Sequence, residues 1–147
     1  LGADHVINIH DDNPVRKVKE ITGEIGADFV LECSGAGNAL NEAVQMVNRG
    51  GRICLAAFPS EQVPVDVMSI VANNIYIYGI RGEGMSATKR AAALMEMKRF
   101  DATLIHTHSF HMNELPEAIR YAKDRVEDAI KVVVKNDAHM TTRQAAE

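Results

Sequence analysis

Hydrophobic and polar positions along this chain follow two alternating patterns. Short apolar runs rich in β-branched and aromatic residues predict strands, and several are apolar almost throughout, as expected for parallel strands covered on both faces. Between them, apolar residues recur every three or four positions, which predicts helices with one buried side. The predicted strands are Val6–Ile9, Ala27–Cys33, Arg52–Ala57, Ile75–Gly79, Ile105–Phe110 and Ile130–Val134.

Capping residues mark where the predicted helices begin and end. Asn13, Asp66 and Asn113 are N-cap residue types that precede helical patterns, and Pro14 and Pro116 suit a first helical turn. The predicted helices run from Asn13 to Gly23, from about Asn38 to Asn48, from Asp66 through Val71, from Ala87 to about Arg99, and onward from Asn113.

Strands alternating with helices predict an α/β fold with an open parallel sheet and helices on both faces. Such a sheet binds its ligand at the carboxyl ends of its strands. Three ends carry small or glycine-rich stretches that let a flat ligand approach the backbone. These stretches are Cys33-Ser34-Gly35, Ala56-Ala57-Phe58 and Gly79-Ile80-Arg81.

Composition narrows the classes of partner. The 147 residues suit one globular domain, and a formal net charge of -4 gives no reason to expect nucleic acid or an anionic membrane as a partner. The chain shows neither an apolar run of membrane-spanning length nor a signal-peptide pattern. Cys33 and Cys54 fit no disulfide framework or metal knuckle, so we expect two buried thiols in a cytoplasmic protein.

Six segments, in order, resemble the medium-chain dehydrogenase/reductase family of zinc-containing alcohol, polyol and threonine dehydrogenases. They cover 1–8 (LGADHVIN), 26–35 (GADFVLECSG), 50–59 (GGRICLAAFP), 77–82 (IYGIRG), 105–110 (IHTHSF) and 129–134 (AIKVVV). The resemblance implies a Rossmann-type doubly wound sheet in a parent enzyme that transfers a hydride between NAD or NADP and an alcohol, polyol or carbonyl product.

The resemblance also implies a cofactor-binding set. It places the stretch Glu32–Gly35 beside the cofactor, so that Cys33, Ser34 and Gly35 border it. Ala56, Ala57 and Phe58 then border the nicotinamide, and the backbone of Ile80 and Arg81 meets its carboxamide. Lys131 would reach the cofactor phosphates, which favour charge-assisted donors. It further implies a homodimer or tetramer assembled through the Ile75–Gly79 sheet edge.

By the same resemblance, we expect the chain to be a C-terminal piece that starts after the phosphate turn, with the sheet incomplete by its first two strands. Residues 1–128 would then be the end of the dinucleotide-binding domain, 129–135 a strand returning to the catalytic domain, and 136–147 a polar tail. The zinc ligands of the parent enzyme lie upstream, so we expect this chain alone to lack activity. Strand Val6–Ile9 would then lack the strands that normally pair with it. We therefore expect either that it is displaced from the sheet, or that another chain or further residues fill the gap.

Other functions remain open. A zinc-free quinone-reductase-like enzyme fits the same segments, a non-catalytic dimerising module fits the predicted sheet edge, and a class I methyltransferase shares the Gly-Gly-Arg strand. Gly35-Ala36-Gly37 could be a phosphate turn, but Leu40 replaces the third glycine, which favours an ordinary strand-to-helix turn.

The histidines near residue 108 and the carboxylate of Glu32 could each have either a chemical or a purely structural role. His106 and His108 would share one face of a strand at a workable metal spacing, with His111 close behind, but no acidic or cysteine partner is evident. We therefore expect that these histidines do not bind a metal ion. Glu32, at a buried strand end, could be catalytic, but a hydrogen-bonded carboxylate near a loop is the favoured interpretation.

Overall fold

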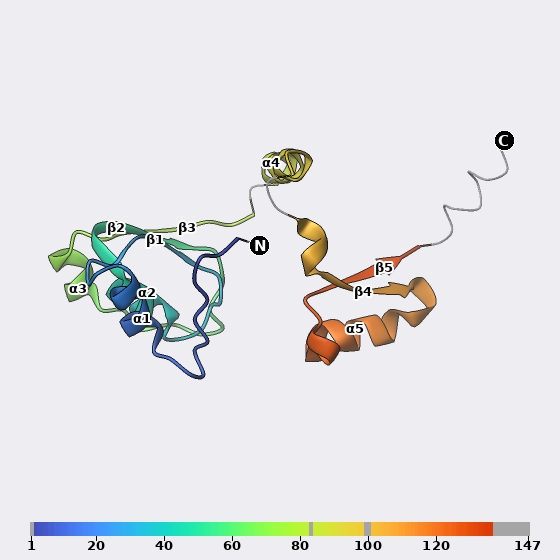
Figure 1. Cartoon of the computed structure of the whole chain (residues 1–147), viewed down its shortest axis with the longest axis horizontal. Helices are drawn as coiled ribbons and strands as arrows, with labels where there is room; N and C mark the ends of the chain where they lie inside the picture. The colour runs from blue at the N-terminus through green and yellow to red at the C-terminus, as the bar shows by residue number, and fades with distance from the viewer. Residues whose placement is uncertain (1, 83, 99–100, 137–147) are drawn as a thin grey trace. The chain divides into compact units, whose positions relative to one another are not determined.

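The computed structural model describes residues 2–82, 84–98 and 101–136 of the chain (Figure 1). The chain divides into two compact units. One is Ala3–Thr88, and the other contains Gly2 and the described residues from Lys89 onward, so that the boundary falls inside α4 (Met85–Glu96). Each unit holds a parallel sheet, which confirms the predicted α/β class. No helix in the described ranges is long and apolar enough to cross a membrane.

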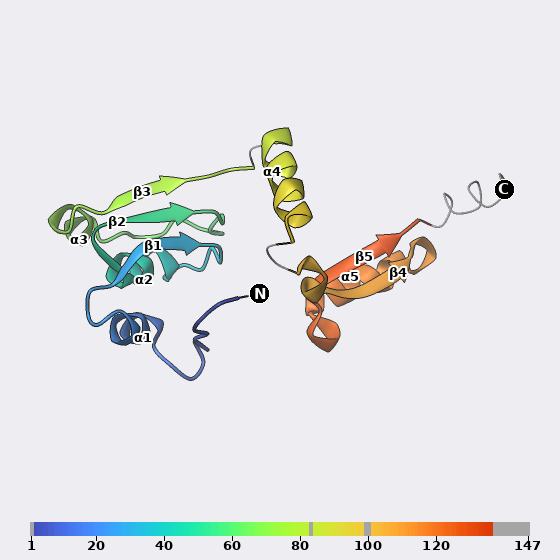
Figure 2. The same cartoon turned by 45° about the horizontal axis from the view of Figure 1, so that its top comes forward.

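The first unit is built on three parallel strands, β1 (Ala27–Glu32), β2 (Val47–Leu55) and β3 (Tyr76–Gly79), paired in the order β1-β2-β3 (Figure 2). The prediction that the strand near Ile75–Gly79 forms a sheet edge is confirmed. Among the described residues β1 forms the opposite edge, which is consistent with the expected absence of the first two strands of the sheet. Parallel pairing brings the three carboxyl ends to one side of the sheet.

Three helices connect these strands: α1 (Pro14–Ile21), α2 (Ala39–Met46) and α3 (Val67–Ala72). Two predicted caps are confirmed. The side chain of Asn13 accepts a hydrogen bond from the Arg16 amide at 3.0 Å, and that of Asp66 accepts one from the Ser69 amide at 3.0 Å. Each cap satisfies an amide that the helix itself leaves without a partner.

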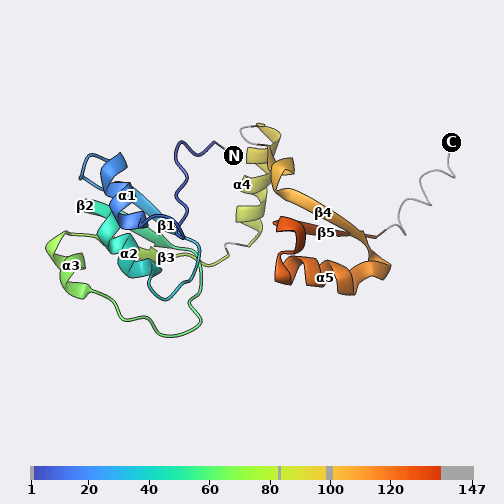
Figure 3. The same cartoon turned by 60° about the horizontal axis from the view of Figure 1, so that its bottom comes forward.

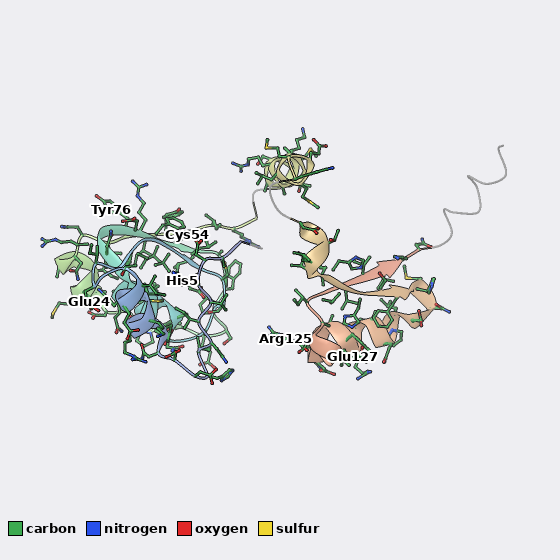
Figure 4. All side chains as sticks on the ribbon, in the orientation of Figure 1. His5, Glu24, Cys54, Tyr76, Arg125 and Glu127 are labelled. Carbon is green, nitrogen blue, oxygen red and sulfur yellow. The ribbon has the colours of Figure 1, made fainter. Side chains whose placement is uncertain are left out.

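The core of this unit lies between the sheet and α2. It contains Ala43 and Val44 of α2 with Val47, Ile53 and Ile75, and the Ile53 side chain is fully buried. Because side chains alternate along a strand, neighbouring positions point to the other face. There Tyr76 is 63% exposed, and Figure 4 shows it projecting from the sheet on the side away from the helices.

The second unit contains a parallel pair, β4 (His106–His111) and β5 (Lys131–Lys135), with α5 (Leu115–Asp124) alongside (Figure 3). The rings of His108 and Phe110 pack edge-on against Tyr121, each with a centroid separation of 5.0 Å. Short 3₁₀ turns complete the connections at Ala102–Ile105, Met112–Glu114 and Val126–Asp128.

The predicted strand Val6–Ile9 is wrong. The segment enters a turn in which the Asn8 carbonyl accepts hydrogen bonds from the amides of Asp11 and Asp12, each at 3.0 Å. Val6 is 88% exposed and Ile9 70%. An apolar run becomes a strand only where another strand satisfies its backbone, and no described residue pairs with this segment.

Several boundaries also differ from prediction. Asn113 lies in a 3₁₀ turn and does not cap α5, whose N-cap is Glu114. Instead, the Glu114 carboxylate turns back and accepts a hydrogen bond from the His111 amide at 2.9 Å. The strand predicted at Arg52–Ala57 begins at Val47 and ends at Leu55, which leaves Ala56 and Ala57 beyond it. Most of the predicted polar tail, residues 137–147, lies outside the described ranges.

The interpretation of both cysteines as buried thiols holds for only one of them. Both thiols are free, and Cys54 on β2 is buried, but Cys33 is exposed. Cys33 follows the last residue of β1, where the chain leaves the sheet for a turn, so the sheet no longer covers its side chain.

Candidate functional site

The three predicted stretches lie side by side at one end of the first sheet. Glu32 is in register with Leu55, and Leu55 with Gly79, so the strands end level with one another. Backbone hydrogen bonds continue just beyond, from the Ala56 amide to the Glu32 carbonyl at 2.8 Å and from the Ile80 amide to the Leu55 carbonyl at 2.9 Å. The sheet therefore fixes the backbone of these stretches before any ligand binds.

The turn after β1 lies directly against the segment after β2. Gly35 adopts φ +67°, and a Cβ placed on it would lie 2.6 Å from the carbonyl oxygen of Phe58. Both the backbone conformation and the lack of space select glycine. Because Gly35 has no side chain, the two segments come close together, and backbone atoms form the surface at the strand ends.

The Glu32 carboxylate organises this turn. One of its oxygens, Oε1, accepts hydrogen bonds from the Ser34 amide at 2.6 Å, the Ser34 hydroxyl at 2.6 Å and the Gly35 amide at 2.8 Å. The Ser34 hydroxyl bond, with the two backbone bonds, holds the pKa of Glu32 below its usual value, although burial acts in the opposite direction. The interpretation of Glu32 as a hydrogen-bonded carboxylate near a loop is confirmed.

A cavity of about 620 Å³ opens beside these strand ends. Glu32, Gly35 and Ala57 line it together with apolar side chains of α2 and β2 and with residues 59–63 and Val65. Sequence reasoning missed the contribution of this loop. The Asn41 side chain holds it, accepting from the Asp66 amide at 3.1 Å and donating to the Pro64 carbonyl at 2.9 Å. Pro59 and Pro64, which restrict the loop backbone, are the sequence signal that could have revealed it.

The segment that follows β3 contributes the positive charge of Arg81 to the site. The Arg81 guanidinium lies 5.9 Å from the centre of the Phe58 ring, and both side chains are exposed. This distance is within reach of a cation–π contact. Phe58 and Arg81, predicted on separate stretches, are thus brought together by the pairing of β2 with β3.

Lys131, the remaining predicted cofactor residue, lies at the start of β5 in the second unit and is exposed. Its contact with a cofactor phosphate stays a prediction.

The predicted common face of His106 and His108 is wrong. The register of β4 shifts between these residues, so the simple alternation fails. The His106 ring contacts the Ser109 hydroxyl at 2.9 Å, whereas His108 packs on Tyr121. In the part of the chain that the structure describes, no group of three or more histidine, cysteine, aspartate or glutamate residues could hold a metal ion.

Comparison with known protein families shows which family this chain belongs to. The sequence model of the family described as "Zinc-binding dehydrogenase" matches residues 1–99, about two thirds of the chain. The chain belongs to the zinc-binding dehydrogenase family. This confirms the resemblance drawn from the six sequence segments.

Individual relatives within the zinc-binding dehydrogenases are consistent with this assignment. An uncharacterised zinc-type alcohol dehydrogenase-like protein of Haemophilus influenzae is 27% identical over 90% of this chain and 38% of its own length. A sorbitol dehydrogenase of Bacillus subtilis is 29% identical over 91% of this chain and 38% of its own. An L-threonine 3-dehydrogenase of Bacillus licheniformis is 29% identical over 78% and 34%. The chain therefore spans little more than a third of the length of these relatives.

Solved structures of the family share the fold. An alcohol dehydrogenase of Thermotoga maritima superposes with a TM-score of 0.82 at 27% identity, covering 92% of this chain and 38% of that one. An alcohol dehydrogenase of a Thermus species gives a TM-score of 0.76 at 26% identity, covering 86% and 35%.

Proposed function

We propose that this chain forms the nicotinamide side of an NAD(P)-dependent oxidoreductase that transfers a hydride between the cofactor and an alcohol, a polyol or the carbonyl product. The observation that carries the proposal is the close approach of Gly35 to Phe58 at the aligned strand ends. A parallel α/β sheet binds its ligand at this end, and a flat ligand needs backbone that it can approach closely. Membership of the zinc-binding dehydrogenase family supports the proposal.

The described residues suit a dinucleotide. Cys33, Ser34 and Gly35 on one side and Ala56, Ala57 and Phe58 on the other would hold it, with Ile80 and Arg81 at the third strand end. Leu40 and Leu55 give the adjoining cavity an apolar wall. When bound, the nicotinamide ring would donate or accept the hydride, while these residues orient the ring and exclude water.

The described residues do not fit a zinc ion, because they include no group of three or more ligands that could hold a metal. We propose zinc only for the longer parent enzyme. That the 147-residue chain is inactive alone stays a prediction. A zinc assay and an NADH oxidation assay with an aldehyde would overturn it by showing stoichiometric zinc or turnover.

Cofactor binding is tested with the full chain labelled with ¹⁵N. NADH should shift the amide resonances of residues 33–35, 56–58 and 80–81 most strongly, and S-adenosylmethionine at the same concentration should leave them in place. The dependence of these shifts on NADH concentration gives the affinity. Binding of S-adenosylmethionine without NADH would favour the methyltransferase alternative and overturn the proposal.

The proposal extends to the class of substrate and to the cellular compartment. Relatives named for sorbitol and L-threonine support a hydroxyl-bearing substrate. Free Cys33 and Cys54 support a reducing compartment such as the cytoplasm.

Self-association through β3 is also part of the proposal. Among described strands, β3 pairs on one side only, and Tyr76 beside that edge is 63% exposed. Light scattering should give twice the 16.1 kDa chain mass, and Tyr76→Lys should lower that value. Met68→Lys, at an 82% exposed position on α3, should leave it unchanged. A monomer at every concentration would contradict this edge as an interface.

A further inference from the structure

Glu32 stands out among the charged side chains that the structure describes because it is buried, with 9% of its surface exposed. A buried carboxylate is costly unless hydrogen-bond donors surround it. Here the donors are two consecutive backbone amides and the hydroxyl of Ser34, all directed at one oxygen. Such a concentration of donors at the end of a strand fixes the turn that follows it.

We propose that Glu32 is a positioning residue, whose carboxylate holds the Ser34–Gly35 turn in the conformation that receives the nicotinamide cofactor beside Phe58. The inference rests on the proposed function and adds to it a residue that acts by holding the turn.

The hydrogen bonds extend from the carboxylate through the turn. Glu32 accepts a hydrogen bond from the Ser34 hydroxyl, which leaves the Ser34 oxygen oriented to accept one from the Ala36 amide at 3.2 Å. The amides of residues 34, 35 and 36 are thereby all engaged, two directly and one through the serine. A turn with its amides satisfied in this way has one preferred conformation.

Glu32 also links this turn to the neighbouring strand end. Its backbone carbonyl accepts the Ala56 amide at 2.8 Å, and its side chain sets the position of Gly35 against the Phe58 carbonyl. One residue therefore contacts the first predicted stretch through its side chain and the second through its backbone. Displacement of the turn would change the width of the surface between the two stretches.

A negative charge is needed at this position. A single oxygen accepting three hydrogen bonds is better served by a carboxylate than by a neutral amide, because charge-assisted bonds are about twice as strong. Glu32→Gln keeps the size and shape of the side chain while removing the charge. It therefore separates the hydrogen bonding of the turn from the packing of the strand.

Asp66 supplies a matched control in the same unit. Its carboxylate also accepts hydrogen bonds from a serine amide and hydroxyl, those of Ser69 at 3.0 and 2.6 Å, but it caps α3 and is not among the cavity-lining residues. Asp66→Asn should cost little stability, because asparagine also caps a helix well, and it should leave the Ser34–Gly35 turn undisturbed. Any effect of Glu32→Gln beyond that of Asp66→Asn is then specific to the strand ends.

The test uses the full 147-residue chain and its two variants. In Glu32→Gln, amide hydrogen exchange at Ser34 and Gly35 should accelerate about tenfold, the equivalent of about 1.4 kcal/mol, and their downfield amide proton shifts should move upfield. NADH affinity should fall about five- to tenfold. Asp66→Asn should change neither the exchange at these amides nor the NADH affinity, and urea unfolding of both variants measures any difference in global stability.

The outcomes separate the two proposals. Unchanged exchange and amide shifts at Ser34 and Gly35 in Glu32→Gln would overturn the positioning role, whether or not NADH binds. Faster exchange with unchanged NADH affinity would also overturn it, since the turn would then not govern the site. If the unsubstituted chain shows no NADH shifts at the strand ends, the proposed function fails, and with it the link from the turn to cofactor.

Discussion

The Cβ position of Gly35 lies 2.6 Å from the carbonyl oxygen of Phe58, so the turn after β1 and the segment after β2 meet with no room for a side chain. This contact joins two stretches of the candidate site that lie more than twenty residues apart in the sequence. Substitutions at Gly35, at the core residue Ile53, at the buried Glu32 and at Thr107 of β4 should therefore have measurable effects on stability.

Replacing Gly35 by alanine should destabilise the first unit. The added Cβ would meet backbone, and the residue would keep φ +67°, so we expect a loss of about 1–3 kcal/mol in the free energy of unfolding. Urea unfolding monitored by circular dichroism measures it. Gly37→Ala is the control, because nothing lies within 4 Å of its Cβ position, and it should change stability by less than about 0.5 kcal/mol. Equal effects at both positions would contradict the contact.

Ile53 should carry a large share of the core energy of the first unit. It is fully buried at the centre of the cluster between β2 and α2, so Ile53→Ala should cost about 2–5 kcal/mol and Ile53→Val about 0.5–1.5 kcal/mol. Val71→Ala on α3, 70% exposed, should stay within about 0.5 kcal/mol. A loss below about 1 kcal/mol for Ile53→Ala would show that the core lies elsewhere.

The stability of the first unit should depend on pH through Glu32. Its folded-state pKa is lowered, first by the Ser34 hydroxyl, so its contribution is present above the unfolded pKa of about 4.3 and is lost as pH falls through the folded value. The difference in unfolding free energy between the unsubstituted chain and Glu32→Gln should therefore shrink as pH is lowered from 7 toward 3. A difference that stays constant or grows on acidification would refute this assignment.

Thr107 should hold the irregular part of the second sheet. Its hydroxyl accepts the Ile130 amide at 3.0 Å and donates to the Lys131 carbonyl at 3.3 Å, at the position where the β4–β5 register shifts. Thr107→Val should cost about 1 kcal/mol and accelerate hydrogen exchange at the Ile130 amide. Thr107→Ser, which keeps the hydroxyl, should restore the protection; if it does not, the hydroxyl is not the cause.

The sequence was informative where a local signal has one structural meaning. Asn13 and Asp66 were recognised as caps because an N-cap depends on residues only a few positions away. Asn113 has the same chemistry but does not cap α5, because Glu114 returns to the His111 amide and a 3₁₀ turn intervenes. Competition between two local hydrogen-bonding solutions cannot be decided from residue type alone.

Signals that need a distant partner were less reliable. Val6–Ile9 has the composition of a strand but is not one, since a strand requires a neighbour to satisfy its backbone. The alternation expected for His106 and His108 failed at a register shift, which depends on β5 more than twenty residues away. The cavity contribution of residues 59–63 was missed because the Asn41 contacts that hold the loop cross the same kind of distance.

The sequence by itself determined the α/β class, the family and the stretches that end each strand, because apolar periodicity and short motifs are written in neighbouring residues. Only the tertiary structure decided that Gly35 meets the Phe58 backbone, that Arg81 lies over the Phe58 ring, and that the Glu32 carboxylate gathers the donors of the following turn. The contacts at Phe58 arise from strand order and register, which parallel pairing sets between segments joined by long crossovers. The convergence at Glu32 depends on the path that the turn takes as the chain leaves the sheet.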